Sequence, residues 1–279
     1  MFICFSTKAI HLEAVTSLTS EAFIATLKRF VSRRGFSSHM YSDQGSNFVG
    51  AEAELREFVE RVNKSASVSS FLAERGIQWH FNPPAALSQG GYWEAGVKST
   101  KYHLKRVVGA STLTLEEFST VLCQVEAVLN SRPICPMSPD PDDFDALTPG
   151  HFLIGQPLVA VPSPDFTEVK TGRLSRWQRT QQMVTHFWRR WSKEYIGSLQ
   201  QRNKWKQQQR IVEVGDLVLL KEDDAPPLKW NIGRIVNVFP DKEGNVRVVT
   251  VKTKSSEYRR PIMKVCPLLT NQQLQQSQL

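Results

Sequence analysis

The chain contains the stretch Ser42-Asp43-Gln44-Gly45-Ser46-Asn47-Phe48, which sets one carboxylate close to a glycine directly after a short β-type run. A second stretch, Gln89-Gly90-Gly91-Tyr92-Trp93-Glu94, opens an amphipathic helix and again sets one carboxylate close to glycines. A fold can build a divalent-ion site from such separate pieces, because Mg²⁺ prefers a few carboxylate oxygens together with water and phosphate. The two stretches predict that Asp43 and Glu94 meet at one edge of a sheet as metal ligands.

The rest of the chain is basic. Its 279 residues carry 35 Lys and Arg against 27 Asp and Glu, which gives a formal net charge of +8. This balance favours an anionic partner, of which nucleic acid is the commonest. A hydrophobic fraction of 41% supports a packed core. The sequence has neither an apolar run of membrane-spanning length nor a signal peptide, so no membrane partner is expected. The excess of basic residues leads us to expect a nucleic acid as partner.

The positive charge is concentrated between Arg173 and Arg210. This segment holds ten basic residues and one acid, Glu194. Aromatic residues interleave with the charges, among them Trp177, Trp188, Trp191 and Tyr195. The aromatic side chains suit the core face of a helix better than they suit base stacking. The basic face suits phosphate contact, for which Arg189 and Arg190 are candidates.

Hydrophobic periodicity and stop signals divide the first half of the chain into strands and helices. Strands are expected at 2–5, 9–15, 38–41 and 77–81. Helices are expected at 20–34, 52–62, 92–108 and 115–129, with a short additional one ending at Gly76. The helix at 115–129 opens with the capping box Thr114-x-x-Glu117. This order predicts a mixed α/β layer fold.

The second half has a different pattern. Residues 135–172 are rich in Pro and Asp and are predicted to form a linker or extended arm. Short strands are expected at 216–221, 233–239, 246–252 and 257–265, which predicts a small all-β barrel. The predicted parts are a core over 1–134, a linker with the basic helix over 135–210, the barrel over 211–269, and a Gln-rich disordered tail over 270–279.

The helix expected at 92–108 places four charged residues on one face, namely Glu94, Lys98, Lys101 and Lys105. One interpretation is an ordinary solvent-exposed stripe whose Glu94–Lys98 pair contributes about 0.2–0.5 kcal/mol. The other is that the lysines follow a phosphate backbone away from a metal at Glu94, which the helix dipole keeps ionised. Gly90 and Gly91 favour the second interpretation, because glycines let a bulky anion approach.

Other residues of the motifs also have two interpretations. Asp43 suits a metal ligand or an ordinary turn. Asn47 suits a substrate contact or a cap for the turn that follows. The four cysteines, Cys4, Cys123, Cys135 and Cys266, show no C-x-x-C pair and no His at zinc-ligand spacing. They are expected to be free buried thiols in a reducing compartment.

Together these residues resemble the catalytic core of retroviral and retrotransposon integrases, the DDE group of the RNase H-like superfamily. The stretch from Ser42 to Phe48 matches the second-Asp motif of that family throughout. The run from Asn82-Pro83 through Ser88-Gln89-Gly90 to Glu94 is similar to its loop-helix motif. Residues 6–13 and the run Trp230-Asn231-Ile232-Gly233-Arg234 look like the Pao/BEL branch of LTR retrotransposons. The resemblance covers nearly all of residues 1–269.

The resemblance implies an RNase H-like mixed sheet with flanking helices, followed by a Src-homology-type barrel. It implies a polynucleotidyl transferase that processes 3′ ends and joins DNA strands, using two Mg²⁺ (or Mn²⁺) ions held by three carboxylates. Asp43 and Glu94 would be two of these ligands. The resemblance implies DNA contacts for Gln89, Lys98 and Lys101. Lys105, on the same helix face, and Asn47, in the Asp43 motif, are further candidates for DNA contact from the residues themselves. A homo-oligomer acting on retrotransposon ends and target DNA, in the nucleus or in a cytoplasmic nucleoprotein particle, is expected.

The sequence departs from the family pattern in three places. No residue matches the first catalytic Asp, because Glu13 is acidic but falls on a later strand. Fifty residues separate Asp43 from Glu94, more than is usual in the family. Gln89 lies one position further from Glu94 than in retroviral enzymes. The strand-like start at 2–5 leads us to expect a truncated chain, and without the first Asp it is expected to be a poor catalyst or none.

Two other functions are compatible with the sequence. One is a DNA-binding remnant or domesticated protein that uses the basic helix and the barrel without any chemistry. The other is a chromatin- or RNA-binding module formed by the barrel. Metal-dependent nicking of a terminal repeat separates the integrase from both.

Overall fold

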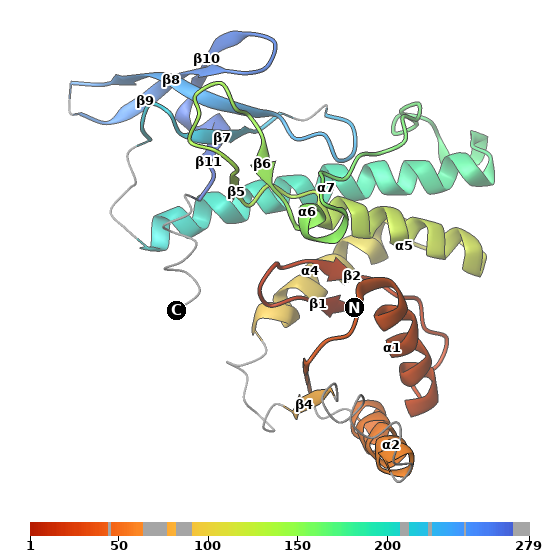
Figure 1. Cartoon of the computed structure of the whole chain (residues 1–279). Helices are drawn as coiled ribbons and strands as arrows, with labels where there is room; N and C mark the ends of the chain where they lie inside the picture. Colours follow the sequence, from red (N-terminus) through yellow and green to blue (C-terminus); the bar gives the residue numbers. More distant parts are fainter. Residues whose placement is uncertain are drawn as a thin grey trace. The chain divides into compact units, whose positions relative to one another are not determined.

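The computed structural model describes residues 1–43, 46–63, 77–81, 91–206, 212–222, 225–242 and 244–269. The chain forms two compact units (Figure 1). The first unit consists of Met1 and His11–Tyr102, and the second of Phe2–Ile10 and His103–Leu279. Helices and strands occur in both, which confirms the mixed α/β class. The RNase H-like sheet, the closed barrel and the part boundaries at 134, 210 and 269 stay predictions. The tail over 270–279 lies outside the described residues.

The first unit is built on two helices that pack together, α1 (Ser20–Arg34) and α2 (Ser46–Asn63). The bounds of α1 match the prediction, because Thr19 caps its start and Gly35, at a φ of +86°, ends it. α2 begins earlier than the predicted residue 52, since Phe48 already packs in the helix against Phe23 of α1, with ring centroids 4.8 Å apart. The short helix expected before Gly76 lies outside the described residues.

The first unit also contains two parallel strands, β3 (His39–Ser42) and β4 (Gln78–Phe81). Their register pairs His39 with Gln78 and Ser42 with Phe81. Both strands were predicted, and both are confirmed. Since parallel strands end at the same edge, Asp43 follows β3 at the edge where β4 also ends.

The expected N-terminal strands are shorter than predicted, at β1 (Phe2–Ile3) and β2 (Ile10–His11). In the second unit, the fully buried Asn130 binds the backbone of Ile10 twice. Its Oδ1 accepts from the Ile10 amide at 2.8 Å, and its Nδ2 donates to the Ile10 carbonyl at 2.7 Å. A side-chain amide therefore satisfies the backbone groups that a further strand would otherwise pair.

Three helices dominate the rest of the chain: α4 (Gly91–Val108), α5 (Leu115–Asn130) and α7 (Arg176–Lys206). The predicted helices are confirmed, and the capping box at Thr114 and Glu117 forms at the start of α5. α7 packs on α5 (Figure 1).

The stretch 135–172, expected to be a linker, contains regular elements. They are β5 (Cys135–Pro136), β6 (Ala146–Leu147), α6 (Pro149–Ile154) and the 3₁₀ turn η1 (Thr171–Arg173). Pro149 lies in the first turn of α6, where its missing amide proton is not needed. The buried Arg234 donates to the carbonyls of Gly215 and Asp143, at 2.7 and 2.6 Å, and holds this stretch to the strands that follow.

A five-stranded antiparallel sheet follows α7, in the order β10-β9-β8-β7-β11. Its strands are β7 (Leu217–Leu220), β8 (Ile232–Pro240), β9 (Val246–Lys252), β10 (Glu257–Pro261) and β11 (Val265–Pro267). The single strand predicted at 257–265 is instead divided into β10 and β11 by the 3₁₀ turn η2 (Ile262–Lys264). Pro261 ends β10, since it has no amide proton for a ladder hydrogen bond.

The sequence Leu217-Val218-Leu219-Leu220 of β7 is buried on both faces of the sheet. Leu217 and Leu219 pack in one core with Ile196 and Leu199 of α7. Val218 and Leu220 pack in a second core formed by the other strands. A strand covered on both sides shows a continuous apolar run and no alternation. The sheet and α7 therefore share one core. Figure 1 shows α7 beside β11 of this sheet.

Trp230 joins α7, the sheet and the end of α5. Its ring centroid lies 4.8 Å from that of Trp188, 6.1 Å from that of Trp191 and 5.6 Å from that of Tyr195. Its indole nitrogen donates to the Ser131 hydroxyl at 3.1 Å. The buried Trp188 and Trp191 confirm the core role predicted for these aromatic residues, whereas Trp177 is 58% exposed.

Replacing Trp230 by Ala should destabilise the second unit by about 3 kcal/mol, because it removes a large aromatic group from three ring contacts. Trp177→Ala is the matched control and should cost less than about 1 kcal/mol, because that side chain is largely exposed. Urea unfolding followed by circular dichroism measures both. Equal costs for the two variants would contradict the role of Trp230.

The starts of α5 and α7 are joined by an ion pair. The Arg176 guanidinium donates to both carboxylate oxygens of Glu117, at 2.7 and 2.6 Å. Together with the hydrogen bond from the Thr114 amide, this lowers the pKa of Glu117 from 4.5 to about 2. The capping box therefore also anchors α7.

Glu117→Gln should make stability less dependent on pH. The folded-state pKa is depressed from 4.5 to about 2, so the contribution of Glu117 is fully present above about pH 4.5 and is lost as the pH falls toward 2. The variant should be less stable than the unmodified chain at pH 7, and the difference should shrink over that window. Urea midpoints at a series of pH values test this. The exposed neighbour is the control, since Glu116→Gln should leave the profile close to that of the unmodified chain.

Candidate nucleic-acid and metal site

The end of β3 positions Asp43. Trp79 on β4 donates from its indole nitrogen to the Ser42 hydroxyl at 2.9 Å, and this hydroxyl donates to the backbone carbonyl of Asp43, also at 2.9 Å. Asp43 itself is exposed. The Ser42 side chain thus fixes the backbone from which an exposed carboxylate projects. Trp79, which sequence reasoning did not single out as part of the site, is the residue that holds it.

Phe48 has a structural role in the same motif. Its ring packs against Phe23, which also contacts Trp79 with centroids 5.7 Å apart. Aromatic side chains therefore tie both ends of the motif to α1. Gln44 and Gly45 lie outside the described residues. Asn47 lies in the first turn of α2, but its side chain is outside the described part, so its assignment to DNA stays a prediction.

The second predicted carboxylate lies in the first turn of α4, since this helix begins at Gly91. The side chain of Glu94 is outside the described part of the structure, and so is the whole of Gln89. The approach of Glu94 to Asp43 and the contact assigned to Gln89 therefore stay predictions.

The lysines of α4 lie on an exposed face. Lys98, Lys101 and Lys105 are all exposed, whereas Thr100 and His103 on the same helix are each only 5% exposed. Within the described ranges, none of the three lysines forms an ion pair. A helix that buries one side and leaves three ammonium groups in solvent on another has charge available for an anionic ligand.

No group of three His, Cys, Asp or Glu among the described residues is arranged to hold a metal ion. Asp43 is a single exposed carboxylate, and one carboxylate is fewer ligands than a two-ion site requires. The described side chains therefore do not by themselves make up the implied Mg²⁺ site.

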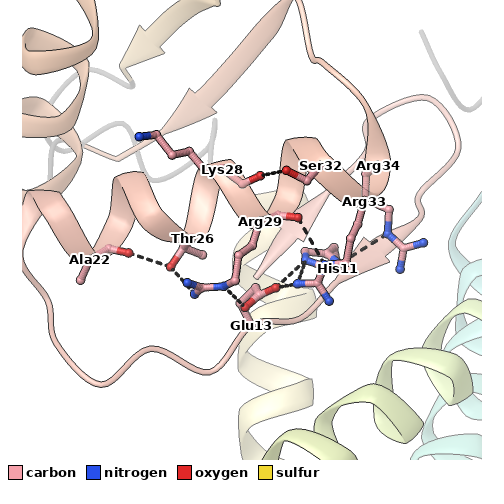
Figure 2. Close-up of polar contacts among 9 residues, drawn as sticks. All are labelled: His11, Glu13, Ala22, Thr26, Lys28, Arg29, Ser32, Arg33 and Arg34. Carbon is pink, nitrogen blue, oxygen red and sulfur yellow. Dashed lines mark hydrogen bonds and ion pairs between the residues drawn. The ribbon is translucent and has the colours of Figure 1, made fainter.

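Glu13 lies in a cluster of charged side chains that has a structural role (Figure 2). One of its oxygens lies 3.2 Å from His11 Nε2 and also pairs with Arg33, and the other accepts from Arg29 Nε at 2.9 Å. Its side chain is only 9% exposed. Because guanidinium and imidazole groups occupy both oxygens, Glu13 holds α1 to the segment after β2, and these contacts leave no free oxygen for a metal ion.

The predicted basic face of α7 is partly used within the fold. Arg189 is paired with Asp165 at 2.7 Å, and Arg190 is exposed. The DNA contacts expected of these two arginines stay predictions. Arg189 already pairs with Asp165 within the chain. Glu194, the one acid of the basic segment, lies 2.5 Å from the Nε2 atom of His103 on α4.

The cysteines are free thiols, but only two of the four are buried. Cys135 and Cys266 are buried and Cys4 and Cys123 are exposed, which corrects the expectation that all would be buried. Burial raises the pKa of the Cys266 thiol to about 12. This thiol packs in the core between α7 and the sheet and is unreactive there.

The comparisons with known proteins cover the two halves unequally. A family model described as a family of unknown function (DUF5641) matches residues 175–268, less than half of the chain. This range coincides with α7 and the five-stranded sheet, which share a core. A comparison with curated proteins finds no match. None of the helices within the described residues combines the length and apolar character needed to cross a membrane.

Solved structures give a distant likeness. One is the cryo-EM structure of the simian T-cell lymphotropic virus intasome in complex with the PP2A regulatory subunit B56 gamma. The sequence identity is 11% and the TM-score is 0.37, with 96% of this chain and 70% of that chain covered. At this TM-score the likeness does not define the fold.

Proposed function

We propose that this chain binds DNA through the lysine face of α4, as part of an integrase-type polynucleotidyl transferase of the Pao/BEL kind. The observation that carries the proposal is the exposed row of Lys98, Lys101 and Lys105. From the first to the last of these, the row extends about 10 Å along the helix axis. Successive phosphates of one DNA strand are about 3.4 Å apart along the duplex axis. The row is therefore long enough to contact several phosphates of a single strand.

The chemical part of the proposal concerns Asp43 and Glu94. We assign them as two of the carboxylates that hold Mg²⁺ or Mn²⁺ in the complete site. When bound, such ions activate a water or hydroxyl group and stabilise the leaving oxygen. Asp43 is supported by its exposed position at a strand end held by Ser42 and Trp79. Glu94 is supported by its place one turn before Lys98, so that DNA held by the lysines would lead to it.

A second candidate is a DNA- or chromatin-binding protein without catalytic activity. It is favoured by the same exposed lysines of α4, which need no metal ion to contact phosphate. It is also compatible with the core that α7 and the sheet share. DNA binding by the lysine face is common to both candidates, whereas metal binding at Asp43 and Glu94 belongs to the first alone.

The DNA contact is tested by neutralising two lysines. The double variant Lys98→Gln/Lys101→Gln should bind duplex DNA more weakly, and by similar factors for unrelated sequences, because phosphate contacts carry no sequence information. Its plot of log affinity against log salt should be shallower by about 1.8, which is about 0.9 per lost phosphate contact. Fluorescence anisotropy with a labelled duplex over a salt series measures both quantities.

The matched control removes the same charge elsewhere. Lys28 on α1 and Lys229 are also exposed lysines, and the double variant Lys28→Gln/Lys229→Gln should change the salt slope much less. If both double variants change the slope equally, only the net charge matters and the α4 interface is rejected. An unchanged slope in the α4 variant also rejects it.

The metal site is tested by Mn²⁺ binding, measured as the loss of the electron paramagnetic resonance signal of free Mn²⁺. Asp43→Asn and Glu94→Gln should each lose saturable Mn²⁺ binding, because an amide keeps the shape but lacks the charge. Neither variant should change the salt slope of DNA binding by more than the Lys28→Gln/Lys229→Gln control does. Asp140→Asn, at an exposed aspartate, should bind Mn²⁺ like the unmodified chain. Unchanged binding in both site variants would favour the non-catalytic candidate.

A further inference from the structure

A pair of histidines lies on one face of the two parallel strands of the first unit. In the β3–β4 register, His80 stands opposite Tyr41, and His39 stands opposite Gln78. Because side chains alternate along a strand, these four residues share one face. The opposite face carries Trp79, which packs against α1 through Phe23. The histidine face is thus the one turned away from that packing.

The two imidazoles meet through their ring nitrogens. His39 Nδ1 and His80 Nε2 are 3.1 Å apart. The ring centroids are 5.3 Å apart, and the ring planes differ by 27°. Nitrogens so much closer than the centroids mean that the rings meet edge to edge, so one nitrogen donates to the other. The two nitrogens therefore point toward each other.

Tyr41 stabilises this arrangement. Its ring stacks on that of His80, with centroids 4.6 Å apart and planes 16° from parallel. The stack limits the rotation of the His80 ring, and the strand pairing sets the separation of the two backbones. A pair of ligands held in place in this way loses little side-chain entropy when it binds an ion.

We propose that His39 and His80 form a two-nitrogen site for a divalent transition-metal ion that prefers imidazole, with Zn²⁺ as the reference ion. Two nitrogens at about 2.0–2.1 Å from one Zn²⁺ lie about 2.8–3.4 Å apart at coordination angles of about 90–110°. The observed separation of 3.1 Å falls within this range. Small rotations of the rings would direct both lone pairs to a common point beside the line that joins the nitrogens.

Proton balance permits the exchange. In the hydrogen-bonded pair, one of the facing nitrogens carries a proton. On metal binding that ring takes its other tautomer, with its proton on the far nitrogen, so both facing nitrogens become ligands and no net proton is lost. No further His, Cys, Asp or Glu of the described ranges completes a three-residue cluster. Water would therefore fill the remaining coordination positions.

This site differs in chemistry from the proposed carboxylate site. Imidazole suits Zn²⁺, Cu²⁺ and Ni²⁺, whereas Mg²⁺ prefers oxygen ligands. An ion between His39 and His80 would join β4 to β3 four residues before Asp43 and so stiffen the strand that carries this carboxylate. The inference does not depend on DNA binding or on catalysis.

Isothermal titration of the full chain with Zn²⁺ tests the proposal. Loss of groups that only orient a metal ligand costs about 10–100-fold in affinity, and loss of a ligand itself costs at least as much. His39→Gln and His80→Gln should therefore each weaken Zn²⁺ binding by about tenfold or more. His186→Gln, which replaces a half-buried histidine on α7, is the control and should leave binding unchanged. Asp140→Asn, at an exposed aspartate outside both proposed sites, should also leave it unchanged, and Mg²⁺ should not compete.

A second measurement uses the unmodified chain. Zn²⁺ should protect His39 and His80 together from modification by diethylpyrocarbonate, as read by peptide mass spectrometry, and should leave His186 reactive. The proposal is rejected if Zn²⁺ protects neither residue or only one of them. It is also rejected if the His39 and His186 variants lose equal affinity.

Discussion

The packing of Trp230 against α7 is the contact on which most of the second unit depends. It brings Trp188, Trp191 and Tyr195 of one helix against a residue next to the sheet, and its indole nitrogen reaches Ser131 at the end of α5. Gly233 and Arg234, which follow Trp230 closely, are also fixed by their surroundings. A side chain at Gly233 would meet the backbone carbonyl of Lys252, 2.8 Å from its Cβ, and the buried Arg234 binds backbone carbonyls. The short run from Trp230 to Arg234 thus interlocks helix, sheet and the preceding stretch.

The first unit uses a comparable device at smaller scale. Trp79 packs on Phe23 and also binds the Ser42 hydroxyl. One side chain therefore attaches the strand pair to α1 and fixes the backbone before Asp43. His39 and His80 lie on the other face of the strand pair, and the exposed carboxylate of Asp43 follows the end of β3. Packing of one face of the β3–β4 pair on α1 holds the backbone of both strands in place. The polar side chains on the other face are thereby kept in fixed positions.

The exposed positive charge of the chain depends on which basic residues are paired with acids within the fold. Glu117 pairs with Arg176, Asp165 pairs with Arg189, and Glu13 pairs with Arg29 and Arg33. Acids bound in this way offset arginines within the fold. The lysines of α4 have no such partner within the described ranges and remain exposed. The positive potential that would attract DNA therefore comes from a few exposed side chains more than from the total of basic residues.

The sequence by itself determined the helices and most strands, because apolar periodicity, the Thr114–Glu117 capping box and Gly35 act over a few neighbouring residues. It also placed Asp43 after a strand and Glu94 in the first turn of a helix. Only the tertiary structure decided the elements within 135–172, since they are held by distant partners such as Arg234. The same holds for the Glu13 cluster, the partner of Arg189, and the meeting of His39 with His80 across 40 intervening residues. Contacts between residues far apart in the chain leave no local periodicity, so sequence patterns alone do not reveal them.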